Sequence, residues 1–231
     1  MNKSPLVVIV SANAEWQAVK EILRPADIHA SRLGEYFDQP CINNQHPMAI
    51  RFFHGGWGKI SAAATTQAAI NRWHPEILVN LGTCGGLKGR IQRGTIILVS
   101  RTIVYDIIEQ MSDPDEAISH YSTDLDLSWL PEPLPHPALR GLLVSGDRDI
   151  VASEIPLLVE KYGAIAADWE SGAIAWVAKR NRVRCLILRG VTDLVGLEGG
   201  EAYGSIQVFH QNTLTVMKTL IEQLPDWVQG C

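Results

Sequence analysis

The sequence is short of cysteine, of basic charge and of long hydrophobic runs, and each shortage excludes a class of protein. A formal net charge of −5 leaves no basic surplus for binding nucleic acid. No apolar run approaches the roughly 20 residues that span a bilayer, so we expect no membrane partner. The cysteines are scattered too widely for a disulfide framework or a paired zinc-ligand spacing, at Cys41, Cys84, Cys185 and Cys231.

The amino terminus and the histidines add two further exclusions. Residues 1–5 lead directly into an apolar run without a small-residue cleavage site, so no secretory signal is evident. Together with the absence of a disulfide pattern, this predicts a cytoplasmic protein. The seven histidines show no ligand spacing such as His-x-x-x-His, so we expect no metal site.

What the chain does have is a regular alternation of strand-like and helix-like segments. Apolar, β-prone runs cover residues 6–10, 47–54, 76–81, 94–104, 140–145, 164–167 and 185–191. Helical patterns cover residues 16–23, 59–73, 153–162, 171–182 and 205–224. The acidic segment 113–137 contains five prolines and predicts a long loop. This alternation predicts an α/β sandwich with a mostly parallel sheet, and no linker divides residues 1–231 into more than one domain.

Two of the predicted strands end in acidic residues. Asp168 and Glu170 directly follow one run, and Asp193 follows another. In α/β proteins, ligands bind at the carboxyl ends of strands, because loops and helix N-termini present polar groups to a crevice there. Glu15 follows the first strand and shares this edge. These acids predict a polar small-molecule site, although they also fit helix N-terminal acids that offset the macrodipole and an ordinary loop aspartate.

Two glycine-rich segments, 55–59 and 82–86, also follow predicted strands. Glycine lets the backbone approach a ligand closely, and a helix N-terminus offers free N–H groups. Neither segment has the spacing of a nucleotide-binding P-loop, and a plain strand–helix turn explains the first one equally well. In the second segment, Thr83 offers a hydroxyl to a ligand. Cys84 has no histidine partner in the sequence, so we expect it to pack rather than to react.

Six short motifs follow one another along the chain, at residues 12–15 (ANAE), 56–59 (GWGK), 80–87 (NLGTCGGL), 140–147 (RGLLVSGD), 168–170 (DWE) and 189–193 (RGVTD). In this order they resemble the nucleoside phosphorylase/nucleosidase superfamily, and most closely the 5′-methylthioadenosine/S-adenosylhomocysteine nucleosidases. The resemblance extends from about residue 7 to the last predicted helix. It implies a single-domain three-layer α/β/α sandwich with a mixed central sheet. It also implies cleavage of the N-glycosidic bond of a purine nucleoside without a metal or organic cofactor.

The resemblance assigns the catalytic roles. The acid matching Asp193 protonates or hydrogen-bonds purine N7, which an aspartate does only if burial keeps it protonated near neutral pH. The glutamate matching Glu15 orients and deprotonates the attacking water, helped by Arg189 and Thr83. The glutamate matching Glu170 holds the ribose hydroxyls, where hydrogen bonds that strengthen in the transition state lower the barrier.

Further substrate contacts follow from the same resemblance. The segment matching Arg148-Asp149-Ile150 contacts the base, partly through the main chain of Ile150, and Gly85 is counted among the substrate-binding residues. The family is usually homodimeric, with a partner residue near the sugar's 5′ position, so we expect a homodimer. We expect segment 113–137 to serve as a lid or a dimer contact.

Four residues depart from the family's pattern around the substrate. Asp149 stands where an aromatic residue usually stacks on the purine, and Asp168 stands where a glutamate is usual. Trp169 replaces a methionine under the ribose, and Trp57 replaces a small aliphatic residue near the 5′ side. We assign all four to the substrate site, with ordinary packing as the alternative for the two tryptophans.

The loop after the first strand separates a hydrolase from a phosphorylase. Phosphorylases of this fold carry a Gly-Asp-Pro-x-Arg type loop there, whose arginine binds phosphate. Residues 11–15 instead place the negative charge of Glu15 where a phosphate would lie. We therefore expect a hydrolase. The alternatives are a futalosine hydrolase or another purine nucleoside hydrolase, a phosphate-dependent phosphorylase, and a non-catalytic nucleoside-binding protein.

Overall fold

The computed structural model describes residues 6–43, 46–203 and 205–229. The expectations for the amino terminus and for Cys231 lie outside these ranges. Only the backbone of Cys41 is described, so the expectation for its side chain is not tested. Within the described ranges, no helix combines the length and the apolarity needed to cross a bilayer.

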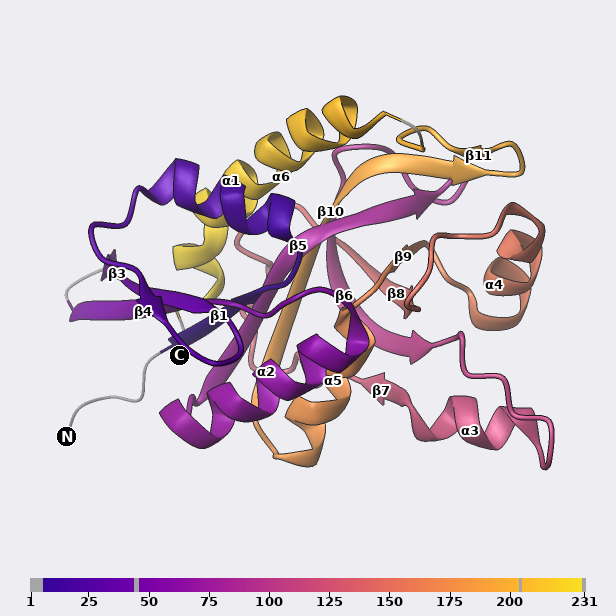
Figure 1. The fold of residues 1–231 in the computed structure, drawn as a ribbon, viewed down its shortest axis with the longest axis horizontal. Coiled ribbons are helices and arrows are strands. Elements are labelled where there is room, and N and C mark those ends of the chain that lie inside the picture. Colours follow the sequence, from indigo (N-terminus) through magenta and orange to yellow (C-terminus); the bar gives the residue numbers. More distant parts are fainter. Residues whose placement is uncertain (1–5, 44–45, 204, 230–231) are drawn as a thin grey trace.

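All the described strands belong to one sheet (Figure 1). They are β1 (Leu6–Val10), β2 (His29–Ala30), β3 (Glu35–Asn43), β4 (His46–His54), β5 (Ile77–Leu87), β6 (Ile96–Val104), β7 (Ser122–Asp124), β8 (Leu139–Ser145), β9 (Ala166–Asp168), β10 (Arg184–Gly196) and β11 (Gly199–Gly200). The order across the sheet is β11-β10-β6-β8-β9-β5-β1-β4-β3-β2, with β7 beside β6. Parallel pairs such as β1–β5 and β8–β9 stand beside antiparallel pairs such as β5–β9 and β3–β4, which confirms the mixed sheet.

Part of this sheet closes on itself. Strand β10 pairs in parallel with β5 and antiparallel with β6, while β5 is also joined to β6 through β9 and β8. Five strands therefore form a closed ring. Strands β1, β4, β3 and β2 extend from β5 as an open sheet, while β7 pairs with β6 and β11 pairs with β10. Closure brings the carboxyl ends of β5 and β10 side by side, which sets up the site described below.

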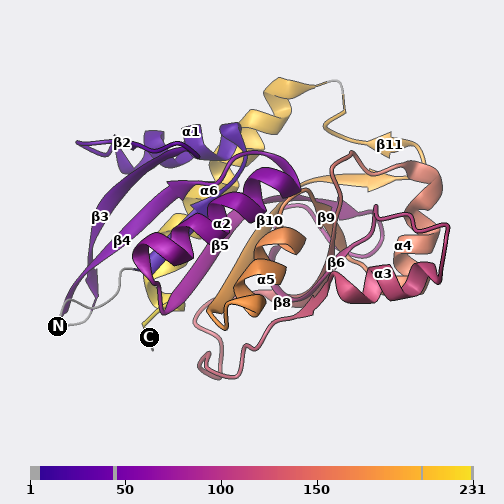
Figure 2. The ribbon, with the colours of Figure 1, turned by 60° about the horizontal axis from the view of Figure 1, so that its bottom comes forward.

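The described α-helices are α1 (Asn13–Leu23), α2 (Gly58–Trp73), α3 (Pro114–His120), α4 (Ile155–Tyr162), α5 (Ser171–Arg180) and α6 (Ile206–Trp227). Four of them cover the two faces of the sheet, while α3 and α4 lie beside its closed part (Figure 1). Figure 2 shows α2 and α5 together on one side of the sheet, with α1 and α6 on the other. The predicted three-layer arrangement is confirmed.

The continuous apolar run of β1 explains why both faces must be covered. Leu6, Val8 and Val10 pack in a core with residues of α1 and α6. The alternate residues Val7 and Ile9 pack in a second core with residues of α2 and α5. Successive strand residues point to opposite faces, so a run without polar residues is stable only between two helical layers.

The structure corrects three predictions of the secondary structure. Segment 82–86 continues β5 beyond the predicted end at residue 81, and residues 192–196 continue β10 beyond the predicted end at residue 191. These two extensions satisfy each other's backbone groups by pairing, which no local pattern reveals. Segment 113–137 is not loop throughout: it contains α3, capped by Asp113 with proline at its first position, and β7. Strands β2, β3 and β11 were not predicted.

Candidate functional site

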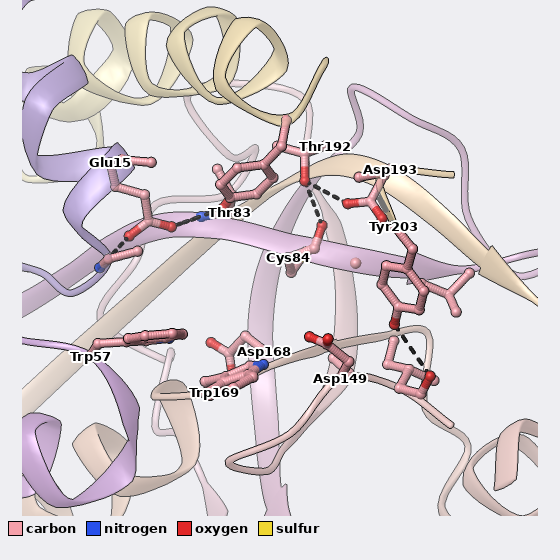
Figure 3. Close-up of a pocket in the computed structure, with 18 of the residues that line it drawn as sticks. Glu15, Trp57, Thr83, Cys84, Asp149, Asp168, Trp169, Thr192, Asp193 and Tyr203 are labelled. Atoms are coloured by element: carbon pink, nitrogen blue, oxygen red, sulfur yellow. Dashed lines mark hydrogen bonds between the residues drawn. The ribbon is translucent and has the colours of Figure 1, made fainter. Parts of the chain in front are cut away.

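A cavity of about 740 Å³ opens at the carboxyl ends of the central strands (Figure 3). Ten of the eleven predicted site residues line it, namely Glu15, Trp57, Thr83, Gly85, Asp149, Ile150, Asp168, Trp169, Glu170 and Asp193. The exception is Arg189, which is fully buried beneath the cavity. No residue of segment 113–137 lines the cavity, so the structure does not support a role of this segment as a lid. Its role as a dimer contact stays a prediction.

The ladder of β5 brings the acids together. Gly85 of β5 lies opposite Asp193 of β10 on one side and Ala167 of β9 on the other. Between Val191 and Asp193 the register shifts, and the extra residue, Thr192, donates its hydroxyl to the Cys84 carbonyl and to Asp193 Oδ1. Bulges of this kind redirect a side chain next to a functional site. Here the bulge lies directly before Asp193, whose side chain lines the cavity.

Glu15 is held firmly from the first turn of α1. Its Oε1 accepts the backbone N–H of Thr83 at 2.5 Å and the Thr83 hydroxyl at 2.9 Å. Its Oε2 accepts the N–H of Ala12 at 3.1 Å, which closes the start of the helix. Two partners on Oε1 and a single one on Oε2 leave the second oxygen with acceptor capacity toward the cavity.

Both carboxylate oxygens of Asp168 are engaged by other protein groups, which its position at a strand end did not imply. Its Oδ1 accepts the Ser145 hydroxyl at 2.6 Å, and its Oδ2 accepts the Ser171 hydroxyl. Arg189 Nη2 lies 2.8 Å from Oδ2. Asp168 touches the cavity, but these contacts occupy its oxygens, so its first role in this structure is to hold the wall.

Arg189 completes this wall from below. Its Nε donates to the Ser171 hydroxyl at 2.9 Å, and its Nη2 donates to Asn80 Oδ1 at 2.7 Å. Its Nη1 lies 3.7 Å from Glu15 Oε1 and has no closer hydrogen-bond partner among the described residues. A Cβ at Gly82 would lie only 1.7 Å from this Nη1. The glycine therefore makes room for a buried guanidinium that positions Asp168 and Glu15 without reaching the cavity.

Glu170 differs from Asp168 although only one residue separates them. Its side chain is buried, and Oε1 accepts a single described donor, the N–H of Gly58 at 3.1 Å. Burial, and then the neighbouring Asp168 carboxylate, raise the pKa of Glu170 to about 8. The group therefore carries a proton at neutral pH and can both donate to and accept from a hydroxyl.

Asp193 lies at the other end of the cavity. Burial raises the pKa of its carboxyl, with the hydrogen bond from Thr192 acting in the opposite direction. The exposed acid Asp149 and the buried residue Ile150 also line the cavity. Tyr203 spans this end, donating its hydroxyl to the Ile150 carbonyl at 3.2 Å.

The cavity also includes residues that the sequence did not bring to attention. They come from the turn after β11 and from the start of α6, and the most prominent are Tyr203, Phe209 and His210. The α6 residues follow no strand end and stand in no motif, so no local signal identifies them. Only the return of the chain from β11 to α6 places them over the cavity.

The two tryptophans lie against each other at the end of the cavity opposite Asp193 (Figure 3). Their ring centroids are 5.2 Å apart and their planes differ by 21°, which is a stacked pair. Trp57 remains 63% exposed. Both tryptophans therefore contact the cavity, and neither is packed in the core.

Cys84 fits the expectation of a packing residue. It is buried, its Sγ lies 3.7 Å from the Gly190 carbonyl, and burial raises the pKa of its thiol far above the ordinary range. A neutral buried thiol is a poor nucleophile. Among the described residues, no group of three or more His, Cys, Asp or Glu side chains is arranged to hold a metal ion.

Comparison with known proteins identifies the family of this chain. A sequence model of the phosphorylase superfamily matches residues 34–224. A 5′-methylthioadenosine/S-adenosylhomocysteine nucleosidase of Staphylococcus saprophyticus is 26% identical over 197 residues, covering 78% of this chain and 82% of that protein. The same kind of nucleosidase from Helicobacter pylori, solved with butyl-thio-DADMe-Immucillin-A, superposes with a TM-score of 0.79 at 15% identity, covering 97% of this chain and 99% of that one.

A second type of enzyme shares the fold equally well. Futalosine hydrolase of Helicobacter pylori superposes with a TM-score of 0.77 at 15% identity, covering 99% of each chain. At such identities the superpositions establish the fold and leave the substrate open.

Proposed function

The chain belongs to the phosphorylase superfamily, and on this premise we propose that it hydrolyses the N-glycosidic bond of a purine nucleoside of the methylthioadenosine/S-adenosylhomocysteine type. The observation that carries the proposal is the pair Glu15 and Asp193, two acids from different elements that line one cavity and have different surroundings. Two titratable groups in contrasting environments supply the base and the acid of a hydrolysis.

Asp193 is the proposed acid. Burial raises the pKa of its carboxyl, so the protonated form needed for donation persists to higher pH. Its proton passes to purine N7 while the bond between C1′ and N9 breaks and its electron pair moves into the purine ring. Protonation makes the base a better leaving group and leaves positive charge on the sugar.

Glu15 is the proposed base. A water molecule held at its Oε2 attacks C1′, and its released proton passes to the carboxylate. The Thr83 donors hold Oε1 and the Ala12 N–H holds Oε2, so the carboxylate keeps its direction throughout the reaction. Solvent then returns both acids to their starting protonation states.

Glu170 holds the ribose hydroxyls between these two acids. Below pH 8 its protonated carboxyl provides both a donor and an acceptor to neighbouring hydroxyls. Asp168 and Arg189 act through it and through Glu15 as positioning residues. Both Asp168 oxygens and the Nε and Nη2 of Arg189 are already engaged by one another, by serines and by Asn80.

A hydrolase is favoured over a phosphorylase by the same contacts. A phosphate beside C1′ would meet the Glu15 carboxylate, and the nearest buried cation, Arg189, is engaged by Asp168. A binding protein without activity ranks lower, because the acid and the base both line the cavity. Futalosine hydrolase remains the main alternative substrate assignment, supported by the shared fold.

The decisive experiment is a base-release assay on a nucleoside panel, with and without phosphate. The panel contains methylthioadenosine, S-adenosylhomocysteine, adenosine, inosine and futalosine. We expect release without phosphate, and we expect Glu15→Gln to bind nucleoside while losing hydrolysis. Release that requires phosphate would replace the hydrolase proposal with a phosphorylase.

We also propose that residues 1–231 act as one domain and assemble as a homodimer. One sheet containing every described strand supports the first point, and resemblance to the nucleosidases supports the second. Analytical ultracentrifugation measures the assembly directly, and a monomer at micromolar concentration would remove this part of the proposal.

A further inference from the structure

The helix that starts beside the proposed sugar site has no cap of its own. Helix α2 begins at Gly58, its first turn contains no acid, and the residue before it, Trp57, provides no side-chain cap. The first N–H groups of a helix have no partner within the helix, so other groups must accept them. Two carboxylates from distant parts of the chain do so. Glu170 accepts the Gly58 N–H at 3.1 Å, and Asp147 accepts the next N–H, that of Lys59, at 2.7 Å.

The side chain of Lys59 joins these acceptors to a second acid. Its Nζ pairs with Asp106 Oδ1 and lies 3.9 Å from Asp147 Oδ2. The other oxygen of Asp106 accepts the Asp147 N–H at 2.8 Å. Asp106 follows β6 and Asp147 follows β8. These three residues, which we call the Lys59 cluster, therefore tie the start of α2 to the ends of two strands.

The packing around the Lys59 cluster leaves the start of α2 little freedom to shift. A Cβ at Gly58 would lie 3.1 Å from Asp147 Oδ1, so there is little room for a side chain between the helix and this carboxylate. The side chains of Lys59 and Asp106 are only 20% and 14% exposed. Solvent screens such a pair less than it screens an exposed one. The cluster therefore fixes the Gly58 N–H, which is the only described donor to Glu170.

The Lys59 cluster acts from outside the cavity. None of its three residues lines the cavity, whereas Glu170 does. The cluster can therefore influence a bound nucleoside only through the backbone of Gly58 and the carboxyl of Glu170. This separates a positioning role from direct contact with the substrate.

Resting on the proposed function, we propose that Lys59 positions Glu170 for the ribose hydroxyls, acting through the start of α2. A single N–H engages Glu170, so the direction of this carboxyl depends on where that N–H points. Lys59 therefore determines how strongly the site prefers a ribonucleoside over a nucleoside without ribose hydroxyls. The loss of one well-oriented hydrogen bond corresponds to about a fivefold change in this preference.

The test compares 5′-methylthioadenosine with its 2′,3′-dideoxy analogue, which lacks both ribose hydroxyls. The ratio of their kcat/KM values for adenine release is measured for the wild type and for each variant. The intrinsic reactivity of the two nucleosides cancels when variants are compared, and an unfolded fraction of enzyme lowers both rates equally. The ratio therefore reports contact with the hydroxyls rather than stability of the fold.

The variants remove the cluster from two sides. Lys59→Met removes the ammonium, and Asp106→Asn removes the charge that pairs with it. The matched control is Lys161→Met, because Lys161 of α4 pairs with Asp115 of α3 and neither residue lines the cavity. We expect the ratio to fall about fivefold in both cluster variants and to keep its wild-type value in Lys161→Met. In a Glu170→Ala background the preference is already lost, so adding Lys59→Met should not change the ratio further.

The outcomes separate this inference from the hydrolase proposal. Adenine release with an unchanged ratio in Lys59→Met overturns the inference and leaves the hydrolase proposal intact. An equal fall in Lys161→Met, a further fall in the Glu170→Ala background, or a wild type without any preference does the same. If no adenine is released, the dissociation constants of the two nucleosides, measured by calorimetry, give the ratio instead. A ratio that then falls in Lys59→Met but not in Lys161→Met supports the inference and removes the hydrolase proposal, and absence of binding removes both.

Discussion

The inner wall of the cavity and its open rim use similar polar groups but pair them very differently. In the inner wall, Asp168 and Arg189 are linked to each other and to Asn80, Ser145 and Ser171 by short contacts. In the rim, the described protein groups leave much of the polar surface of Asp193 and Asp149 unengaged. A buried charge is tolerated only when it is paired, so the wall supplies fixed geometry. The rim keeps the groups that are free to meet a substrate.

The largest expected effect comes from removing the acid of the rim. Asp193→Asn cannot deliver a proton, so turnover at pH 7 should fall by about 10²- to 10⁴-fold while nucleoside affinity changes little. Steady-state base release and equilibrium binding measure the two effects. Asp149→Asn, an exposed acid at the same end, should keep turnover within a few-fold, and equal losses in both variants would contradict the assigned role.

The next largest effect comes from breaking the wall. Arg189→Met leaves Asp168 buried without its cation, and the free energy of unfolding should fall by about 3–5 kcal/mol. Urea denaturation measures this loss. The control is Arg93→Met, which removes an exposed ion pair with Glu201 and should cost about 0–1 kcal/mol. Equal losses in the two variants would mean that the buried pair of Asp168 and Arg189 stabilises the fold no more than an exposed ion pair does.

A pH titration sharpens the contrast between Asp168 and Glu170. In the unfolded chain Glu170 ionises near 4.5, whereas in the folded protein it does so near 8. Between these values the folded state holds a proton that the unfolded state releases, so the stability contribution present below pH 4.5 is lost as pH rises toward 8. Denaturation midpoints at pH 5, 7 and 9 should fall more steeply for the wild type than for Glu170→Gln. Parallel curves would contradict the shifted pKa.

The smallest expected effect concerns the hydroxyl that spans the base end. Tyr203→Phe removes one hydrogen bond to the Ile150 carbonyl, worth about 1 kcal/mol. If this bond arranges the bound base, KM should rise about fivefold with little change in kcat. A large drop in kcat would instead move Tyr203 into the catalytic step.

The sequence was sufficient to predict the parts of the fold that depend on local pattern. The apolar run at β1 and the helix after it need only periodicity and a stop before Pro25, and both were predicted. The continuation of β5 through residues 82–86 was missed because three glycines there resemble a loop. That segment becomes a strand only through its pairing with β9 and β10, a tertiary effect that local propensity does not contain.

The residues of the candidate site also divide into those that the local sequence predicted and those that it did not. Glu15, Glu170 and Asp193 were assigned to one site because each follows a predicted strand, and α/β proteins bind ligands at strand ends. The position of Arg189 beneath the cavity was not predictable, since it depends on the space that Gly82 leaves in the neighbouring strand. Tyr203, supplied by the return of the chain from β11 to α6, has no signal of its own.

The ladder between β5 and β10 has a consequence for synthesis of the chain on the ribosome. Its paired residues, such as Ile77 and Arg184, are about a hundred positions apart, and such distant pairings form slowly. A nascent chain therefore carries Glu15 and Thr83 well before Arg189 and Asp193 exist, with one edge of β5 unpaired. The proposed site is complete only when the last third of the protein has been made. Fragments that end before Arg184 should aggregate through that open edge rather than bind nucleosides weakly.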